Sequence, residues 1–324
     1  MGFGRLALAT LGILVLSVFV GRYPRPYWMP ISYLWKDELA LRLVLYLRLP
    51  RILTAFLMGM ALSAAGVAMQ TVFRNPLVSP GFLGISQGAA FGAAFSIVFL
   101  SPSAIVVESS AAVFALAALG VSYLLASKIR YGDWVLRLVL AGIVSAALFS
   151  SGVGVLKYLA DPLRQLPEIV FWLMGGLWSV SWRDLLSILP PVTLGLVILY
   201  LMRWRLNLLG LSDATAFSLG ASPARERGVA LVASVVATAA VIAVGGVVGW
   251  VGLIVPHVAR RIVGADAQRV LPASMLIGGA FALLCDNLAR VLLAGEIPLG
   301  IVTSLIGALV FIVMFARADL GVRR

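Results

Sequence analysis

The chain is poor in charge and nearly devoid of residues that hold metals or form disulfides. Only 12% of its 324 residues are charged, against about 25% in soluble domains, whereas 62% are hydrophobic. One histidine, His257, and one cysteine, Cys285, exclude an intrachain disulfide and leave no basis for predicting a metal site. Together with a mean hydropathy of +1.06, this composition indicates a membrane protein with no room for a sizeable soluble domain.

Catalytic machinery is also missing. The sequence contains no Gly-x-x-x-x-Gly-Lys-Ser/Thr phosphate loop, so it offers no P-loop site for ATP. Asp286 and Glu296 are too isolated to predict paired-carboxylate catalysis. We therefore predict no enzyme activity and no cofactor on this chain; any ATP and magnesium would be bound by a separate ATPase subunit.

The net charge of +12 is a topology signal and does not indicate nucleic-acid binding. With the N-terminus assigned to the cytoplasm, cytoplasmic segments hold 15 of the 25 Lys and Arg residues but only 5 of the 13 acids. This asymmetry follows the positive-inside rule. It predicts a multi-pass protein of the cytoplasmic (inner) membrane with both termini in the cytoplasm.

Apolar segments predict an all-α integral membrane protein of about ten transmembrane helices, forming one polytopic domain over residues 1–324. The first segment resembles a signal peptide but lacks a small-x-small cleavage site, so we expect it to remain. The segment at residues 253–263 is too short to cross alone and contains Pro256, so we expect it to begin inside the membrane. The predicted spans are residues 6–20, 49–70, 83–100, 105–127, 135–157, 185–202, 228–248, 253–263, 271–293 and 299–316.

Three motifs carry a resemblance to a known family. Residues 47–90 read LRLPRILTAFLMGMALSAAGVAMQTVFRNPLVSPGFLGISQGAA, residues 249–261 read GWVGLIVPHVARR, and residues 296–307 read EIPLGIVTSLIG. In this order they closely resemble the FecCD family, the permease subunits of ABC importers for iron-siderophores, haem and vitamin B12. The resemblance implies a fold like that of the vitamin B12 permease. It also implies a second copy of this chain, two ATP-binding cassette ATPase subunits and an extracytoplasmic substrate-binding protein as partners in the lipid bilayer.

A short cytoplasmic helix is predicted within residues 206–227. Ser212 can cap its start, where Asp213 favours the helix dipole, and Gly220 suits the position past its end. An ordinary amphipathic loop helix would look the same. The FecCD resemblance implies a coupling helix that sits in a groove of the ATPase, although Leu211-Ser212 replaces the family's common Gly-Glu. The predicted coupling residues are Leu211, Ser212, Asp213, Ala214, Thr215, Ala216, Phe217, Ser218, Leu219 and Gly220.

Two further sites follow from the resemblance. Arg48 and Arg51 lie on the predicted external side, where they could simply snorkel to the headgroups. The resemblance implies that they dock acidic residues of the binding protein, together with Arg290, whose alternative is an i,i+4 pair with Asp286. Asn75 and Leu77, in the loop after the second span, match the family's cytoplasmic gate, although a simple helix-breaking turn is the alternative.

The sequence leaves the substrate open. Iron-siderophores, haem, cobalamin and molybdate share these motifs, and a bulky ferric chelate leads on family frequency. An ion-gradient-driven secondary transporter is the alternative function, for which Asp286 would be the intramembrane coupling acid. A lone His257 favours a hydrogen-bonded packing residue over a ligand for haem or iron.

Overall fold

The computed structural model describes residues 2–24 and 27–321, nearly all of which are helical or in short connections. The chain runs α1 (Phe3–Phe19), β1 (Val20–Gly21), β2 (Tyr27–Trp28), α2 (Tyr33–Lys36), α3 (Glu38–Leu43), α4 (Leu49–Val72), α5 (Ile85–Phe95), α6 (Ala104–Lys128), α7 (Trp134–Leu159), α8 (Gln165–Met174), α9 (Trp182–Leu201), α10 (Arg203–Leu209), α11 (Asp213–Ser218), α12 (Pro223–Gly245), α13 (Val251–Val263), α14 (Ala267–Val291) and α15 (Leu299–Gly321). A π-helical turn joins α3 to α4 and another extends α5 to Leu100. The all-α prediction is confirmed; β1 and β2 form only a two-residue antiparallel pair.

Each of the ten predicted spans falls on a helix. Among the described residues, six helices are long and apolar enough to cross a membrane by length and composition. They are Glu38–Val72, Ala104–Lys128, Trp134–Leu159, Trp182–Leu201, Pro223–Gly245 and Ala267–Val291. Shorter apolar helices cover Phe3–Phe19, Ile85–Leu100 and Leu299–Met314. The chain is thus a multi-pass membrane protein, as the composition predicts.

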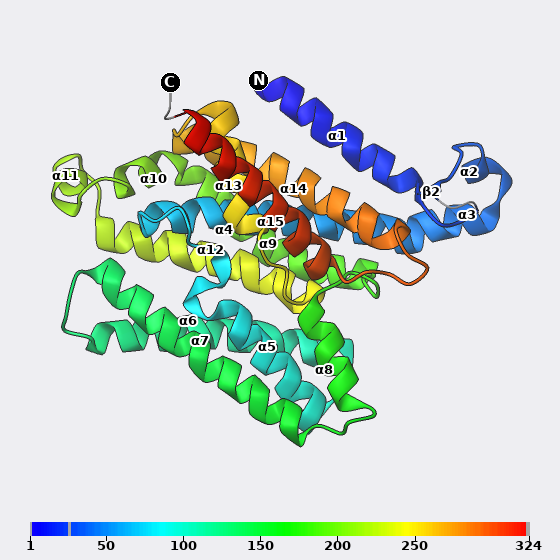
Figure 1. Ribbon diagram of the computed structural model, residues 1–324, viewed down its shortest axis with the longest axis horizontal. Coiled ribbons are helices and arrows are strands. Elements are labelled where there is room, and N and C mark those ends of the chain that lie inside the picture. The colour runs from blue at the N-terminus through cyan, green and yellow to red at the C-terminus, as the bar shows by residue number, and fades with distance from the viewer. Residues whose placement is uncertain (1, 25–26, 322–324) are drawn as a thin grey trace.

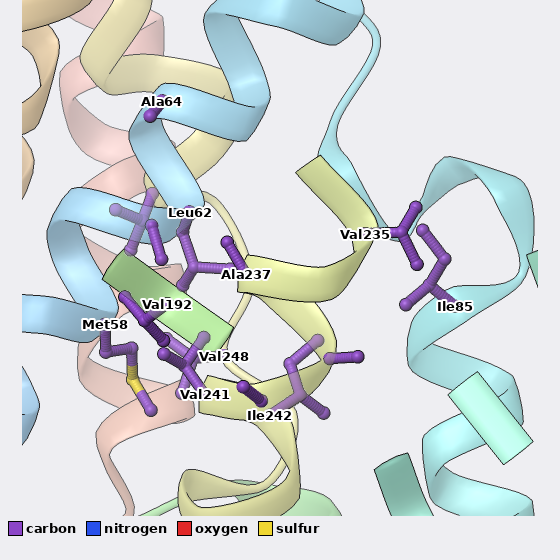
Figure 2. Close-up of a cluster of buried hydrophobic side chains, with 14 of the residues drawn as sticks. Met58, Leu62, Ala64, Ile85, Val192, Val235, Ala237, Val241, Ile242 and Val248 are labelled. Atoms are coloured by element: carbon purple, nitrogen blue, oxygen red, sulfur yellow. The ribbon is translucent and has the colours of Figure 1, made fainter. Parts of the chain in front are cut away.

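Helix α4 forms the centre of the molecule. It packs against α14 and α13 on one side and against α12 and α9 on the other, whereas α5, α6 and α7 form a separate layer against α12 (Figure 1). Figure 2 shows the contact: Met58 and Leu62 of α4 face Val192 of α9, with Val241 and Val248 beside them. Helix α11 lies at one end of the molecule and α2 and α3 at the opposite end (Figure 1).

Glycines allow α4 and α14 to cross in backbone contact. A Cβ on Gly59 would lie 2.0 Å from the carbonyl oxygen of Gly278, and a Cβ on Gly278 would lie 2.3 Å from that of Gly59. Because lipid tails are as apolar as leucine, such close approach and its dispersion contacts hold membrane helices together. The small residues of this span therefore serve tight helix packing at the crossing.

Gly59→Ala should therefore lower stability by about 1–3 kcal/mol, the usual cost of overpacking. The added methyl group meets backbone that has no side chain to rotate away. Gly120→Ala in α6 is the matched control, since nothing lies within 4 Å of its Cβ position. Thermal unfolding of both variants in detergent tests this; equal midpoints would contradict the packing argument.

The short span predicted around Pro256 is a half-helix. Helix α12 ends at Gly245, and the chain turns through Gly246 and Trp250, whose φ angles are 66° and 69°, into α13. The 13 residues of α13 extend about 20 Å at 1.5 Å per residue, less than a bilayer core of about 30 Å. Its first turn lies against the middle of α4, where a Cβ on Gly66 would meet the Gly252 carbonyl at 2.0 Å. The non-helical backbone is buried or half-buried and lines cavities within the protein, where a membrane tolerates it.

Candidate functional site

The three arginines predicted to dock a binding protein meet at one end of the molecule. Arg48, Arg51 and Arg290 are each less than 10% exposed and line one cavity of about 260 Å³. Arg48 donates hydrogen bonds to the carbonyl oxygens of Val18, at 3.0 Å, and Tyr23, at 2.8 Å. The structure thus gathers the three side chains, but it does not leave Arg48 as a free surface charge.

Arg51 connects two carboxylates that the sequence keeps ten residues apart. Its Nε lies 2.9 Å from Asp286 Oδ1 and its Nη1 lies 2.8 Å from Glu296 Oε2. Arg290 Nε lies 3.0 Å from Asp286 Oδ2, so the i,i+4 pair considered as its alternative role is present. Asp286 is fully buried and is neutralised by two guanidinium groups. The role of Glu296 as a partner of Arg51 could not be read from the sequence, because only the fold brings them together.

The cavity keeps an excess of positive charge. Arg22 joins the three buried arginines in its lining, and Glu296 is the one acid among the described residues that line it, with Asp286 directly behind. Four guanidinium groups against two carboxylates give a positive potential that would attract an acidic partner. Trp178 and Tyr23 add aromatic side chains to a wall whose other apolar side chains are aliphatic.

The loop after α4 has a defined shape. The side-chain oxygen of Asn75 accepts a hydrogen bond from the Leu77 backbone N–H at 2.9 Å, and the Val78 N–H bonds back to the Asn75 carbonyl at 3.3 Å. This local Asx turn, with Pro76 in the middle, follows the end of α4 at Val72 and leaves the Leu77 side chain 57% exposed. The turn is present, and the gate role remains a prediction.

The short helix predicted within residues 206–227 forms as α11, from Asp213 to Ser218. Ser212 Oγ accepts from the Thr215 N–H at 3.2 Å, which confirms the cap, and Gly220 adopts a φ of 80° just past the helix. Leu211, Phe217 and Leu219 expose 40%, 74% and 57% of their surface. Because Phe217 is this exposed on a helix outside the spans, α11 presents an apolar surface that no other described part of the chain covers.

Asp213 ties α11 to two other parts of the chain. Its carboxylate binds Arg227 at the start of α12, with Nη1 at 2.9 Å from Oδ2, and Arg74 of the loop after α4, with Nη2 at 2.7 Å from Oδ1. The Arg227 hydrogen bond, followed by that of Arg74, lowers the pKa of Asp213 to about 2. Sequence reasoning gave Asp213 only a helix-dipole role; it missed both arginines, which no local pattern connects to it. Helix α11 and the loop after α4 are therefore in direct contact.

Asp213→Asn should loosen α11. The carboxylate is more than half exposed, so we expect a loss of no more than about 1 kcal/mol, seen as faster amide exchange across α11. Because folding lowers this pKa, the stabilisation is complete above the unfolded value of about 3.9 and is lost as pH falls through about 2. Exchange corrected for intrinsic rates should then be constant between about pH 5 and 8. Asp133→Asn, which alters the cap of α7, is the control; a similar increase across α11 in that variant would refute the assignment.

His257 packs inside α13. Its Nδ1 lies 2.8 Å from the Leu253 carbonyl, to which it donates. Within the described residues no group of three His, Cys, Asp or Glu side chains could hold a metal ion. The hydrogen bond favours the packing role. Nearby, Arg260 Nη2 donates to Gln70 Oε1 at 2.6 Å, and Gln70 Nε2 donates to the Leu253 carbonyl at 3.2 Å, which fixes α13 against α4.

The sequence and the fold are both similar to those of known transport proteins. Residues 9–317 match the model of the FecCD transport family. The chain is 39% identical to the molybdate import system permease protein MolB of Haemophilus influenzae, covering 97% of this chain and 93% of that protein. It is 40% identical to the hemin transport system permease protein HmuU of Yersinia pestis, covering 84% and 83%. A solved structure described as an inward-facing conformation of a metal-chelate type ABC transporter superposes with a TM-score of 0.90 at 38% identity, over 97% of this chain and 98% of that one.

Proposed function

Because the chain belongs to the FecCD transport family, whose members are transport permeases of ABC importers and not catalytic enzymes, we propose a specific assembly for it. Two copies of the chain form the pathway, two ATPase subunits bind ATP and magnesium below it, and an extracytoplasmic protein delivers cargo from above. The complex resides in the cytoplasmic membrane with both chain termini in the cytoplasm. The cargo is a bulky iron chelate, haem or cobalamin, with molybdate as the alternative that the MolB relative favours.

The observation that carries this proposal is the exposed apolar face of α11. A helix of six residues outside the spans has no reason to expose Phe217 and Leu219 to water unless another protein covers them. Coupling through α11 is supported by Asp213, because a movement of this helix would pull directly on Arg74 next to the gate residues Asn75 and Leu77. An ATPase that moved α11 would thus also move the loop that narrows the cytoplasmic mouth.

The opposite end supports docking of the binding protein. Acidic side chains of a docked partner would find Arg48, Arg51 and Arg290 in one cavity with excess positive charge. Arg51 is already paired with Asp286 and Glu296. A docked carboxylate would therefore compete with Glu296, the exposed acid of the pair, and leave the buried Asp286 contact in place.

The same ion pairs weaken the case for a secondary transporter. Such a protein couples transport to an intramembrane acid that releases and takes up an ion. Asp286 is already paired with two fixed positive charges, those of Arg51 and Arg290. It is therefore a poor coupling group.

Purification from the native membrane in mild detergent tests the assembly. We expect a P-loop ATPase to co-purify with the chain in near-equal amount. After reconstitution into vesicles, the complex should transport ferric chelate only when ATP is present on the side of the membrane that carries the ATPase. A folded, dimeric chain that binds no ATPase, or uptake that follows an ion gradient without ATP, would overturn the proposal.

A further inference from the structure

Many polar side chains within the helical layers have a partner in the chain, although single buried hydroxyls such as those of Thr54, Thr238 and Ser274 do not. Ser63 donates to the Ser274 carbonyl at 2.7 Å, Ser122 to the Leu83 carbonyl at 3.0 Å and Ser145 to the Ala118 carbonyl at 3.2 Å. The membrane interior offers no water, so unbonded polar groups there are costly. A place where several such groups lack a partner therefore faces something polar that the chain does not supply.

One cavity of about 340 Å³ is such a place. It lies between α5 and α7, and its polar lining consists of Ser86, Gln87, Ser150 and Lys157. None of these four side chains makes a hydrogen bond or ion pair with any described residue, and Gln87 Oε1 is buried without a partner. Four unbonded polar side chains thus gather at one cavity, whereas the serines named above each bond a backbone carbonyl.

The cavity extends from the middle of the membrane-crossing layer toward the end that carries the arginine cavity. The start of α5 lies against the middle of α7, since a Cβ on Gly84 would be 3.0 Å from the Ala146 nitrogen. Ser150 and Lys157 are seven residues apart, two turns along one face of α7, and Lys157 is two residues from its end. Figure 1 shows α5 and α7 running side by side. A molecule travelling along this face of α7 would pass all four side chains.

The chemistry of the lining is one-sided. Lys157 supplies three donors and a positive charge, the serines supply hydroxyls, and Gln87 supplies an amide, whereas no carboxylate lines the cavity. Such a set complements an oxygen-rich anion. We propose that this cavity is a transient contact for anionic cargo, an oxyanion or a carboxylate-bearing ferric chelate, in preference to a neutral corrinoid or hydroxamate. The inference rests on the proposed transport function and narrows its substrate class.

The cavity would bind an anionic cargo only weakly, so the cargo could move on. One ammonium group with neutral donors binds an anion as a point charge, without the bidentate geometry by which arginine holds carboxylates and phosphates. A cargo already selected by a binding protein needs a surface of this kind, because a tight site would retain it. Lys157 therefore sets a preference for charge and not a high affinity.

A thiol placed in the cavity tests the inference without any transport. Cys285, the one native cysteine, is buried, so Ser150→Cys adds the reactive thiol in proteoliposomes of the full chain in zwitterionic lipid. A sulfonate-bearing thiol reagent should modify it faster than a trimethylammonium one of equal size, and Lys157→Gln should reduce this rate ratio about fivefold. Lys128→Gln, an exposed lysine at the other end of the layer, should leave the ratio unchanged.

Protection then identifies the occupant. Molybdate and ferric citrate should slow the modification of the Ser150→Cys thiol when Lys157 is retained, and should not slow it when Lys157→Gln is added. Cyanocobalamin should have no effect in either protein. A ratio that does not respond to Lys157→Gln, or protection by cyanocobalamin alone, would overturn the inference. Protection by added anionic lipid and not by either anion would assign Lys157 to a headgroup and overturn it too. Because these readouts need no ATPase, they can fail while ATP-driven uptake stands, and they can succeed if it does not.

Discussion

Asp286→Asn should destabilise the protein more than any other change in its ion-pair cluster, by about 3–5 kcal/mol. The carboxylate is completely buried and is shared by Arg51 and Arg290. Asparagine keeps the shape but removes the charge, which leaves two guanidinium groups facing each other across a neutral amide. Arg51 would retain Glu296, but Arg290 would keep only Asn287 and the carbonyls of Ser17 and Val20.

Glu296→Gln is the matched control. Its side chain is 41% exposed, and Arg51 keeps its bond to Asp286, so the cost should stay below about 1 kcal/mol. Thermal unfolding of the purified chain in detergent measures both. If the two variants unfolded at the same temperature, the buried carboxylate would not be the centre of the cluster. If Asp286→Asn were neutral while abolishing uptake, an ion-coupling role would have to be reconsidered.

The positions of the helices could be predicted because a membrane restricts which segments can cross it. A segment that crosses hydrocarbon must be apolar and must satisfy its backbone internally, so each predicted span corresponds to a helix. The half-helix α13 was also predictable, since Pro256 and its short length exclude a full crossing. The cap of α11 followed from the local chemistry of Ser212 and Gly220. All these features depend on neighbours in sequence.

The partners across the fold were not predictable in the same way. Arg51 and Glu296 are 245 residues apart, and Arg74 and Asp213 are 139 apart. Each charge looks solitary in the sequence, which is why Arg51 reads as a free docking group and Asp213 as a helix-dipole residue. The unbonded set around Lys157 was hidden for the opposite reason. A polar side chain in a span looks the same whether it bonds a carbonyl or faces a cavity, and only the satisfied ones around it reveal the difference.

Phe217→Asp should remove the ATPase from the complex. Phe217 is the most exposed of the large apolar side chains of the α11 segment, and an aromatic anchor at the centre of an interface commonly contributes about 2 kcal/mol or more, equivalent to about a 30-fold loss of affinity. A carboxylate at this position adds the cost of burying a charge. ATP-driven uptake should fall at least in proportion, while the fold persists because Phe217 supports no other element.

Tyr131→Asp provides the comparison. Tyr131, in the α6–α7 connection, is 78% exposed and is assigned to the same side of the membrane. It tests whether a carboxylate in place of any exposed aromatic residue on that side would release the ATPase. Co-purification of the ATPase with wild type and Tyr131→Asp but not with Phe217→Asp would establish α11 as the contact. Retention of the ATPase by Phe217→Asp would mean that the exposed face of α11 serves another partner. The link from Asp213 to Arg74 would then transmit that partner's binding to the loop after α4, because the ion pair connects α11 to this loop whatever covers the helix.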